Sequence, residues 1–303
     1  MTATSDAFPA QPAVDAPLRR TRPFLWSVKR ELWENRGIYI GPVIAAAVVL
    51  FGVVLGHTTA HQIILNPRSH HPSVMPPILP YAFATGAIAV TSFIVGFFYC
   101  LGALNHERRD RSVLFWKSLP VSDVTTVLSK AVVPALILPV VTVAVVFATH
   151  LLMLGMDLAH NAVRGGDAAD LLAKLPLGQV WLDVAYAYLL LVFWWAPLWS
   201  WLLLASAWAK RMTFLWGVGP PLAICVVEGM AFPGSHYAGS ALGQRLLSGI
   251  SAGFTTVPTG DSVELPWPDP VPFLQSPGLW IGLVVAAVFL AGAVWLRRRR
   301  EPI

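Results

Sequence analysis

Residues 131–156 read AVVPALILPVVTVAVVFATHLLMLGM and contain no aspartate, glutamate, lysine or arginine. Because a membrane's hydrocarbon core takes about 20 apolar residues in a helix to cross, this stretch predicts a transmembrane helix. The remaining sequence agrees, since 56% of the 303 residues are hydrophobic and only 12% are charged. Soluble domains carry roughly 25% charged residues. The composition therefore excludes a soluble globular protein and predicts an integral membrane protein.

Five further apolar runs have spanning length. They lack the alternating pattern of a membrane β-barrel and are longer than its strands, which have roughly 10 residues. We therefore expect an all-α integral membrane protein with six transmembrane helices. In the fifth span, the run Gly217–Pro221 is the place where a kink or break is expected. The predicted spans are 38–56, 81–104, 131–156, 180–209, 212–232 and 278–296.

Lysine and arginine gather on one side of this arrangement. The segments before the first span, between the second and third, between the fourth and fifth, and after the sixth carry 17 of the 21. Because cytoplasmic loops hold the excess of Lys and Arg, both termini are predicted in the cytoplasm. The net charge of +5 thus reports topology and contact with membrane lipids, and no nucleic-acid partner is predicted. Residues 1–22 are predicted to be a disordered cytoplasmic tail.

Residues 23–37 (PFLWSVKRELWENRG) predict an amphipathic helix in the membrane interface, because they begin with proline, end with glycine and carry Leu25, Val28 and Leu32 at helical spacing. The cations of this helix are expected to lie near anionic lipid headgroups. The helix either anchors the fold or acts as a lever for a cytoplasmic partner. Its candidate interfacial residues are Trp26, Lys29, Arg30, Glu31 and Trp33.

The loop after the second span is charged first, then strongly apolar, and its apolar part ends at Leu119 and Pro120. Ser122 or Asp123 can cap a second short helix that runs into the third span. An apolar stretch in a cytoplasmic loop needs cover, so it either dips into the interface or is buried by a partner protein. The candidate coupling residues are Arg111, Val113, Leu114, Phe115, Trp116, Lys117, Leu119, Pro120 and Asp123.

The order of residues in this loop resembles that of permease subunits of type-2 ATP-binding-cassette (ABC) exporters. In that family a charged stretch, a short helix ending in Leu-Pro, a nearby serine and a lysine before the next span form the coupling segment. The matching residues here are Glu107–Arg111, Leu119–Pro120, Ser122 and Lys130. The six spans, the internal termini and the amphipathic N-terminal helix also match. Residues 112–116 depart from the family's commoner pattern, which affects the expected substrate rather than the class.

The resemblance implies a transport subunit of a bacterial inner membrane that is not an enzyme and binds no cofactor by itself. It implies that ATP and Mg bind a separate cytoplasmic ABC ATPase in two copies, and that the permease pairs with a second copy or a close paralogue. Short outer-leaflet helices are expected between the fifth and sixth spans. No Gly-Lys dipeptide occurs in the chain, so the P-loop that cradles phosphates is missing.

Three residues within the spans are candidates for a substrate path or gate. Glu228 is an acid inside the fifth span, and intramembrane carboxylates are expensive and often functional. It can instead reach water or a helix terminus. Trp195 and Trp199 lie deep in the fourth span and can line an amphiphile path or pack against lipid.

Two other function classes stay open at this stage. An ion-coupled secondary transporter would carry several embedded carboxylates and a repeat, and an intramembrane enzyme would need a recognisable catalytic or metal motif. His57 and His61 have a spacing that could place both rings on one metal, but no HExxH motif accompanies them. We therefore predict neither a metal site nor catalytic residues.

Overall fold

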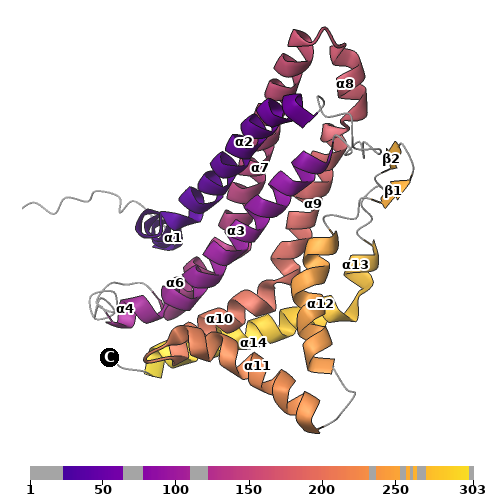
Figure 1. Cartoon of the computed structure of the whole chain (residues 1–303). Coiled ribbons are helices and arrows are strands. Elements are labelled where there is room, and N and C mark those ends of the chain that lie inside the picture. Colours follow the sequence, from indigo (N-terminus) through magenta and orange to yellow (C-terminus); the bar gives the residue numbers. More distant parts are fainter. Residues whose placement is uncertain are drawn as a thin grey trace, which may run out of the picture.

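The computed structural model describes most of the chain and is predominantly helical (Figure 1). Six of its helical segments are long and apolar enough to cross a membrane, as predicted. In the described part, the strands are a single antiparallel pair, Val257–Thr259 (β1) and Ser262–Glu264 (β2). The described residues are 23–63, 78–109, 122–231, 237–252, 257–259, 262–264 and 271–299.

The N-terminal part forms α1 (Pro23–Glu34) and α2 (Gly37–Ile63). A turn at Asn35–Arg36 separates them, in which the Asn35 amide donates to the Glu31 carbonyl at 3.0 Å. The predicted helix over 23–37 therefore ends earlier than expected. Gly37 begins the first span instead of closing the amphipathic helix.

The next part contains α3 (Leu79–Ala103) and the short α4 (Asn105–Arg109). Helix α6 (Asp123–Val132) then begins at an N-cap, where Ser122 Oγ accepts a hydrogen bond from the Thr125 amide at 3.1 Å. The predicted capped helix leading into the third span is therefore confirmed.

The third span is longer than predicted, because α6 continues without a break into a π-helical turn and α7. The turn, Val133–Ile137, contains Pro134, and α7 runs over Leu138–Val163. Proline has no amide hydrogen to donate within a helix, and a locally wider turn is a common response. The predicted span 131–156 thus becomes one helical segment from Asp123 to Val163.

The predicted fourth span, 180–209, is divided in the structure. After α8 (Ala168–Lys174), α9 (Leu177–Trp194) ends at Trp195, and α10 (Ala196–Trp208) begins there in a new direction. Pro197 lies in the first turn of α10, where its missing amide hydrogen is tolerated.

The fifth span is not broken at Gly217–Pro221, where a kink or break was expected. Helix α11 (Thr213–Ala231) runs without interruption through Pro220 and Pro221. Between α11 and the last span lie α12 (Tyr237–Ala252), the β1–β2 pair and α13 (Val271–Gln275). The chain then ends in α14 (Pro277–Arg299).

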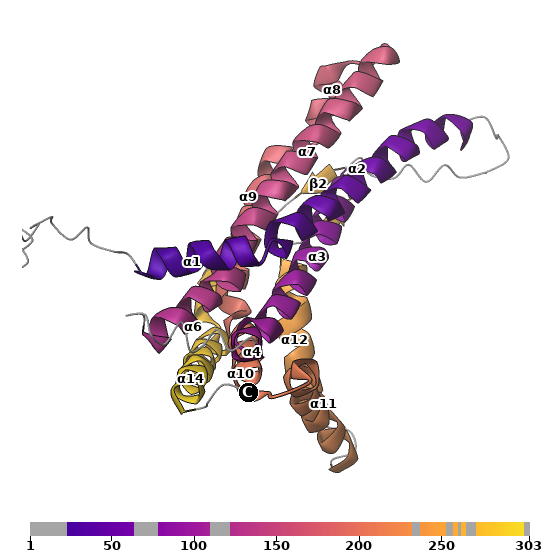
Figure 2. The ribbon, with the colours of Figure 1, turned by 90° about the vertical axis from the view of Figure 1, so that its left-hand side faces the viewer.

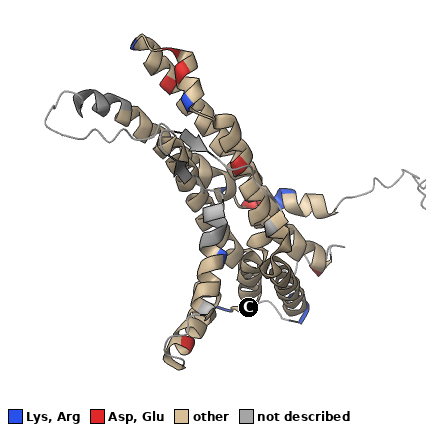
Figure 3. Cartoon of the chain, turned by 90° about the vertical axis from the view of Figure 1, so that its right-hand side faces the viewer, with Lys and Arg blue, Asp and Glu red and all other residues tan. Residues whose placement is uncertain are grey.

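The helices form two groups that share one end (Figure 1). Helices α2, α3, α7 and α9 run side by side, whereas α10, α11 and α14 cross below them. Helices α1, α4 and α6 and the chain's C-terminus lie at the end where the two groups meet. Figure 3 colours the charged residues along the ribbon and shows long uncharged stretches between them.

The largest hydrophobic core lies between α3, α10 and α14, where both groups of helices contact each other. Trp199, Leu202 and Leu203 of α10 are almost fully buried there. Small side chains such as Ala293 of α14 allow close approach. This core packs α10 against α14 of its own group and α3 of the other.

Candidate functional site

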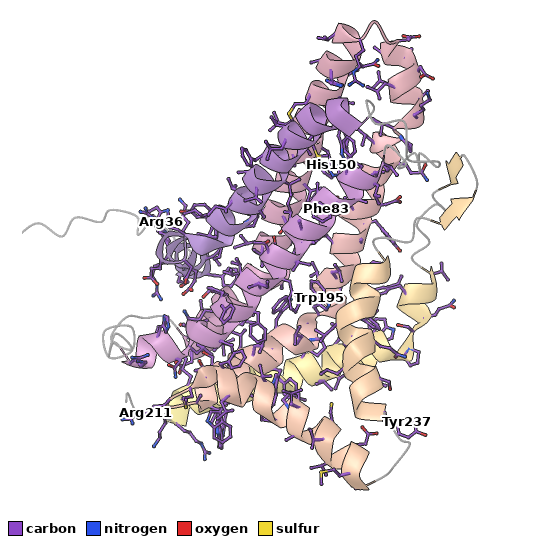
Figure 4. The ribbon with its side chains drawn as sticks, in the orientation of Figure 1. Arg36, Phe83, His150, Trp195, Arg211 and Tyr237 are labelled. Atoms are coloured by element: carbon purple, nitrogen blue, oxygen red, sulfur yellow. The ribbon has the colours of Figure 1, made fainter. Side chains whose placement is uncertain are left out.

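Six charged side chains meet where α1, α4, α6 and the end of α14 come together, and we call them the charge cluster. Three are acids and three are bases, so the cluster is balanced in charge. The helices that carry them come together at the end of the molecule where Figure 4 labels Arg36 and Arg211. The members are Arg30, Glu31, Glu107, Asp123, Lys130 and Arg297.

Glu31 attaches α1 to the rest of the molecule. Its side chain is only 2% exposed, and one carboxylate oxygen accepts a hydrogen bond from Lys130 Nζ at 2.6 Å. The other oxygen accepts from the Tyr99 hydroxyl at 3.0 Å. A carboxylate on α1 is therefore paired with groups on α3 and α6.

Glu107 lies at the centre of the cluster. Its Oε1 accepts from Arg30 Nη2 at 2.7 Å and lies 3.1 Å from Lys130 Nζ. Its Oε2 accepts from Arg297 Nη1 at 2.6 Å. Arg297 Nε in turn donates to Asp123 Oδ1 at 3.0 Å. One acid on α4 thus joins cations from three other helices.

The pairing explains why these charges can be buried. Taking one ion out of water costs several kcal/mol, which an opposite charge with good hydrogen-bond geometry offsets. Each cluster member has at least one such partner. Moving one of the four helices alone would leave buried charges unpaired, so the cluster couples their positions.

A second group of polar contacts connects this end of the molecule to α10. Ser206 Oγ accepts hydrogen bonds from the amides of Leu104 and Asn105, both at 3.1 Å. The Asn105 side chain also donates to the Ala209 carbonyl at 2.6 Å. The junction of α3 and α4 is therefore fixed to the C-terminal end of α10.

The charge cluster adjoins the predicted coupling segment on both sides. Helix α4 ends at Arg109 and α6 begins at Asp123, directly after its N-cap Ser122, so the described chain on both sides of the segment leads into helices of the cluster. Asp123 is the candidate coupling residue that the structure describes. The others, Arg111, Val113, Leu114, Phe115, Trp116, Lys117, Leu119 and Pro120, lie outside the described residues.

The side chains of α1 are oriented differently from the sequence expectation, with two tryptophans exposed and Arg30 facing the protein. Trp26 and Trp33 are 62% and 69% exposed, and the Lys29 ammonium lies 5.4 Å from the centroid of the Trp26 ring. Arg30 was expected to face lipid headgroups together with Lys29. Its guanidinium instead turns inward, because the carboxylate of Glu107 lies within hydrogen-bond distance.

The structure does not bring the three substrate-path candidates together. Trp195 and Trp199 are buried in the core and pack edge to face on each other, with ring centroids 5.9 Å apart. The cavity that they border has a volume of only about 20 Å³. Glu228 Oε1 accepts from the Tyr237 amide at 2.6 Å, which places it at the start of α12. Figure 4 shows Tyr237 far from Trp195.

The break between α9 and α10 is held by Arg245 of α12, a residue that no sequence motif singled out. Its guanidinium donates to the carbonyls of Trp194, at 3.2 Å, and of Gly278. It also stacks 4.2 Å from the Trp194 ring centroid. The Arg245 carbonyl accepts from the indole nitrogens of Trp194 and Trp195, both at 3.1 Å. We call this arrangement the Arg245 junction.

The charge on Arg245 is retained although the side chain is partly buried. Burial lowers the pKa of this guanidinium from its ordinary value, but arginine does not deprotonate in proteins. Among the described residues no carboxylate pairs with it. Carbonyl oxygens and an aromatic ring stabilise the cation instead.

His150 is a second residue that sequence reasoning missed. It is fully buried in α7, and its Nδ1 accepts from the indole nitrogen of Trp181 at 3.2 Å. Its Nε2 lies 3.1 Å from both the Tyr81 carbonyl and Thr85 Oγ1. These contacts join α3, α7 and α9. An ionisable side chain in a span without acids or bases was the available signal.

Within the described part of the chain, no group of three or more His, Cys, Asp and Glu side chains could hold a metal ion. Comparison of the chain with protein-family models, curated proteins and solved structures finds no match. The functional argument therefore depends on the residues of this chain and on their geometry.

Proposed function

We propose that this chain is the transmembrane permease subunit of an ABC exporter in a bacterial inner membrane. It moves a substrate outward with energy from ATP, which is hydrolysed with Mg by a separate cytoplasmic ATPase. The assembly contains two permeases and two ATPases. Both chain termini face the cytoplasm, and α12 and α13 lie in the outer leaflet.

The observation that carries this proposal is the charge cluster. It joins α1, the two helices that adjoin the coupling segment, and the last span through buried ion pairs. A subunit driven from outside needs such a connection, because a force applied to residues 111–120 must reach the spans. Ser206 supplies a second route, through α10 to the Arg245 junction.

In this proposal the ATPase contacts the apolar residues around Trp116 and the exposed aromatic face of α1. Nucleotide-driven closure of the ATPase pair shifts both elements together, since Glu31 and Glu107 join them to Lys130. Rigid movement of packed helices is a common mode of such transitions. Trp195 and Trp199 would contribute to a substrate path only after the helices separate.

Co-purification tests the proposal most directly. The chain is co-expressed with the ABC ATPase encoded nearest to its gene, and we expect a stable complex with vanadate-sensitive ATP hydrolysis. Failure of the two chains to co-purify, together with absence of that hydrolysis, would reject the proposal. Transport that needs a proton gradient and no ATP would support the ion-coupled alternative.

A pair of variants at one position locates the contact. We expect Trp116→Glu to dissociate or uncouple the ATPase while the protein keeps its wild-type elution profile in detergent. Trp116→Phe, which retains an apolar ring, should keep the complex. Misfolding of Trp116→Glu alone would assign Trp116 a structural role instead.

A further inference from the structure

A large crevice lies between α2, α3 and the outer part of α7, with α8 at one end. Its volume is about 1410 Å³. Apolar side chains of α2 and α3, such as Ile44, Val48 and Phe83, line most of it, and all three are more than half exposed. Figure 2 shows α2 diverging from α7 and α8, and Figure 4 labels Phe83 on α3.

Glycines on α2 show where the wedge-shaped crevice is closed and where it is open. A β-carbon built on Gly41 of α2 would lie 2.7 Å from Val95 Cγ2 of α3, so the two helices touch there. At Gly52 and Gly56 of α2 it would meet nothing within 4 Å. Because Val49 of α2 shares a buried cluster with Tyr81 and Ala84 of α3, those two helices stay packed, and the crevice widens where α2 diverges from the end of α7 (Figure 2).

The wedge is long enough to accept a lipid tail. From Gly41 to Gly56 it extends on the order of 22 Å, at 1.5 Å per helical residue. One leaflet of a bilayer contributes about 15 Å of hydrocarbon. Because α2, α3 and α7 belong to membrane-spanning segments, the exposed side of the crevice opens toward lipid.

Polar side chains lie at the wide end of the wedge, on the last turns of α7. Asp157 accepts from the Tyr81 hydroxyl at 2.6 Å. Arg164 is exposed and lines the crevice about 10 Å further along the helix. Its guanidinium pairs with no acid among the described residues. The crevice is thus apolar along its length and polar at its mouth, where Tyr81 binds the Asp157 carboxylate and Arg164 supplies an exposed cation.

We propose that this crevice binds a glycerophospholipid of the membrane, with the acyl chains in the wedge and the phosphate at Arg164. The apolar walls match the tails, and the cation at the mouth matches the anionic phosphate. A helix from a second copy of the chain could fill the wedge but would bring no phosphate to Arg164. The site depends only on the membrane-spanning character of these helices and not on an ATPase partner.

Photolabelling of the full chain tests the site. The protein is reconstituted into vesicles of phosphatidylethanolamine and phosphatidylglycerol that contain a trace of phosphatidylglycerol with a photoactivatable acyl chain. A parallel sample contains diacylglycerol with the same photoactivatable chain and no phosphate. We expect the phospholipid label on peptides covering 41–56 and 79–91, and several-fold less label from diacylglycerol.

Two matched pairs of variants separate the tail site from the phosphate site. Gly52→Phe places a ring where the acyl chain would lie. It should reduce the label about tenfold, in line with the cost of overpacking an occupied site. Gly229→Phe is the control, because a side chain on Gly229 of α11 also meets open space. Arg164→Gln should lower phospholipid labelling about fivefold, as expected for one lost cation–lipid contact. Lys174→Gln, at the same end of the molecule, should leave it unchanged.

The wild-type label map decides the question even where a variant does not fold. Label spread evenly over all lipid-facing helices, including α11, would overturn the proposal in favour of ordinary surrounding lipid. Cross-links from crevice residues to a second copy of the chain would overturn it in favour of a protein occupant. Equal labelling by phospholipid and diacylglycerol would show that the phosphate does not contribute to binding, and would reject the proposed contact with Arg164.

Discussion

The charge cluster and the Arg245 junction bury charge in opposite ways. In the cluster, three acids and three bases from four helices neutralise one another at distances of 2.6 to 3.4 Å. At the junction a single cation is held by backbone carbonyls and an aromatic ring. Both arrangements join helices that are distant in the sequence.

The two arrangements differ in how much free energy is lost when one of their members is removed. In the cluster, removal of one member leaves an opposite charge buried without its partner, so its helices are strongly coupled. At the junction, removal of Arg245 leaves only carbonyl groups without a donor, at a smaller cost per group. The cluster therefore suits a rigid connection, and the junction suits a contact that can open.

The largest effect is expected from Glu107→Gln. This change removes the charge that Arg30, Lys130 and Arg297 share, and we expect a loss of about 3–5 kcal/mol in the free energy of unfolding. The measurement is thermal unfolding of the purified chain in detergent. Glu34→Gln is the control, because Glu34 is 53% exposed and, among the described residues, pairs only with Arg30. Equal destabilisation by both variants would contradict the proposed central role of Glu107.

A double-mutant cycle at Glu31 and Lys130 sharpens the comparison. The two side chains are 2% and 3% exposed and lie 2.6 Å apart. Glu31→Gln and Lys130→Met should each destabilise the fold, and the double variant should be less destabilised than their sum by about 2 kcal/mol. Chemical unfolding of the four proteins under one condition gives this coupling. Additive effects would mean that neighbouring cluster members replace the missing partner.

At the junction we expect an effect whose sign depends on Arg245. A β-carbon on Gly282 of α14 would lie 2.9 Å from Arg245 Cζ, so Gly282→Ala should destabilise the wild type by about 1–2 kcal/mol. In an Arg245→Ala background the same change should stabilise the protein by up to about 1 kcal/mol, because alanine favours helix over glycine. Thermal unfolding of the three variants measures both values. If Gly282→Ala destabilised both the wild type and the Arg245→Ala variant, the added methyl group would clash with a residue other than Arg245.

The smallest effect is expected at Glu228, a carboxylate that belongs to neither the charge cluster nor the Arg245 junction. It accepts from the backbone amide of Tyr237, and loss of such a cap costs about 1 kcal/mol. Glu228→Ala should show this loss, whereas Glu228→Gln keeps an acceptor oxygen and should match the wild type in stability and transport. A transport defect in a stable Glu228→Gln protein would restore Glu228 as a gate.

The spans were predictable because apolar runs are a local property of the chain. Each of the six predicted spans overlaps one helical segment of spanning length, although the predicted fourth span, 180–209, also takes in α10, which lies beyond the break at Trp195. The cap at Ser122 was predictable for the same reason, since it involves residues three apart. The charge cluster was not, because Glu107 and Arg297 are separated by 190 positions and nothing in the sequence pairs them.

The prolines show most clearly what the local sequence does not predict, namely which of them accompanies a helix break. Pro42, Pro220 and Pro221 lie inside continuous helices, whereas a helix break lies beside Pro197. The sequence by itself determined a membrane protein of six helical spans, because hydrophobicity and length are sufficient for that. Only the tertiary structure decided which span breaks and which charges are buried. Both depend on partners such as Arg245 and Glu107, which other segments of the chain bring into contact.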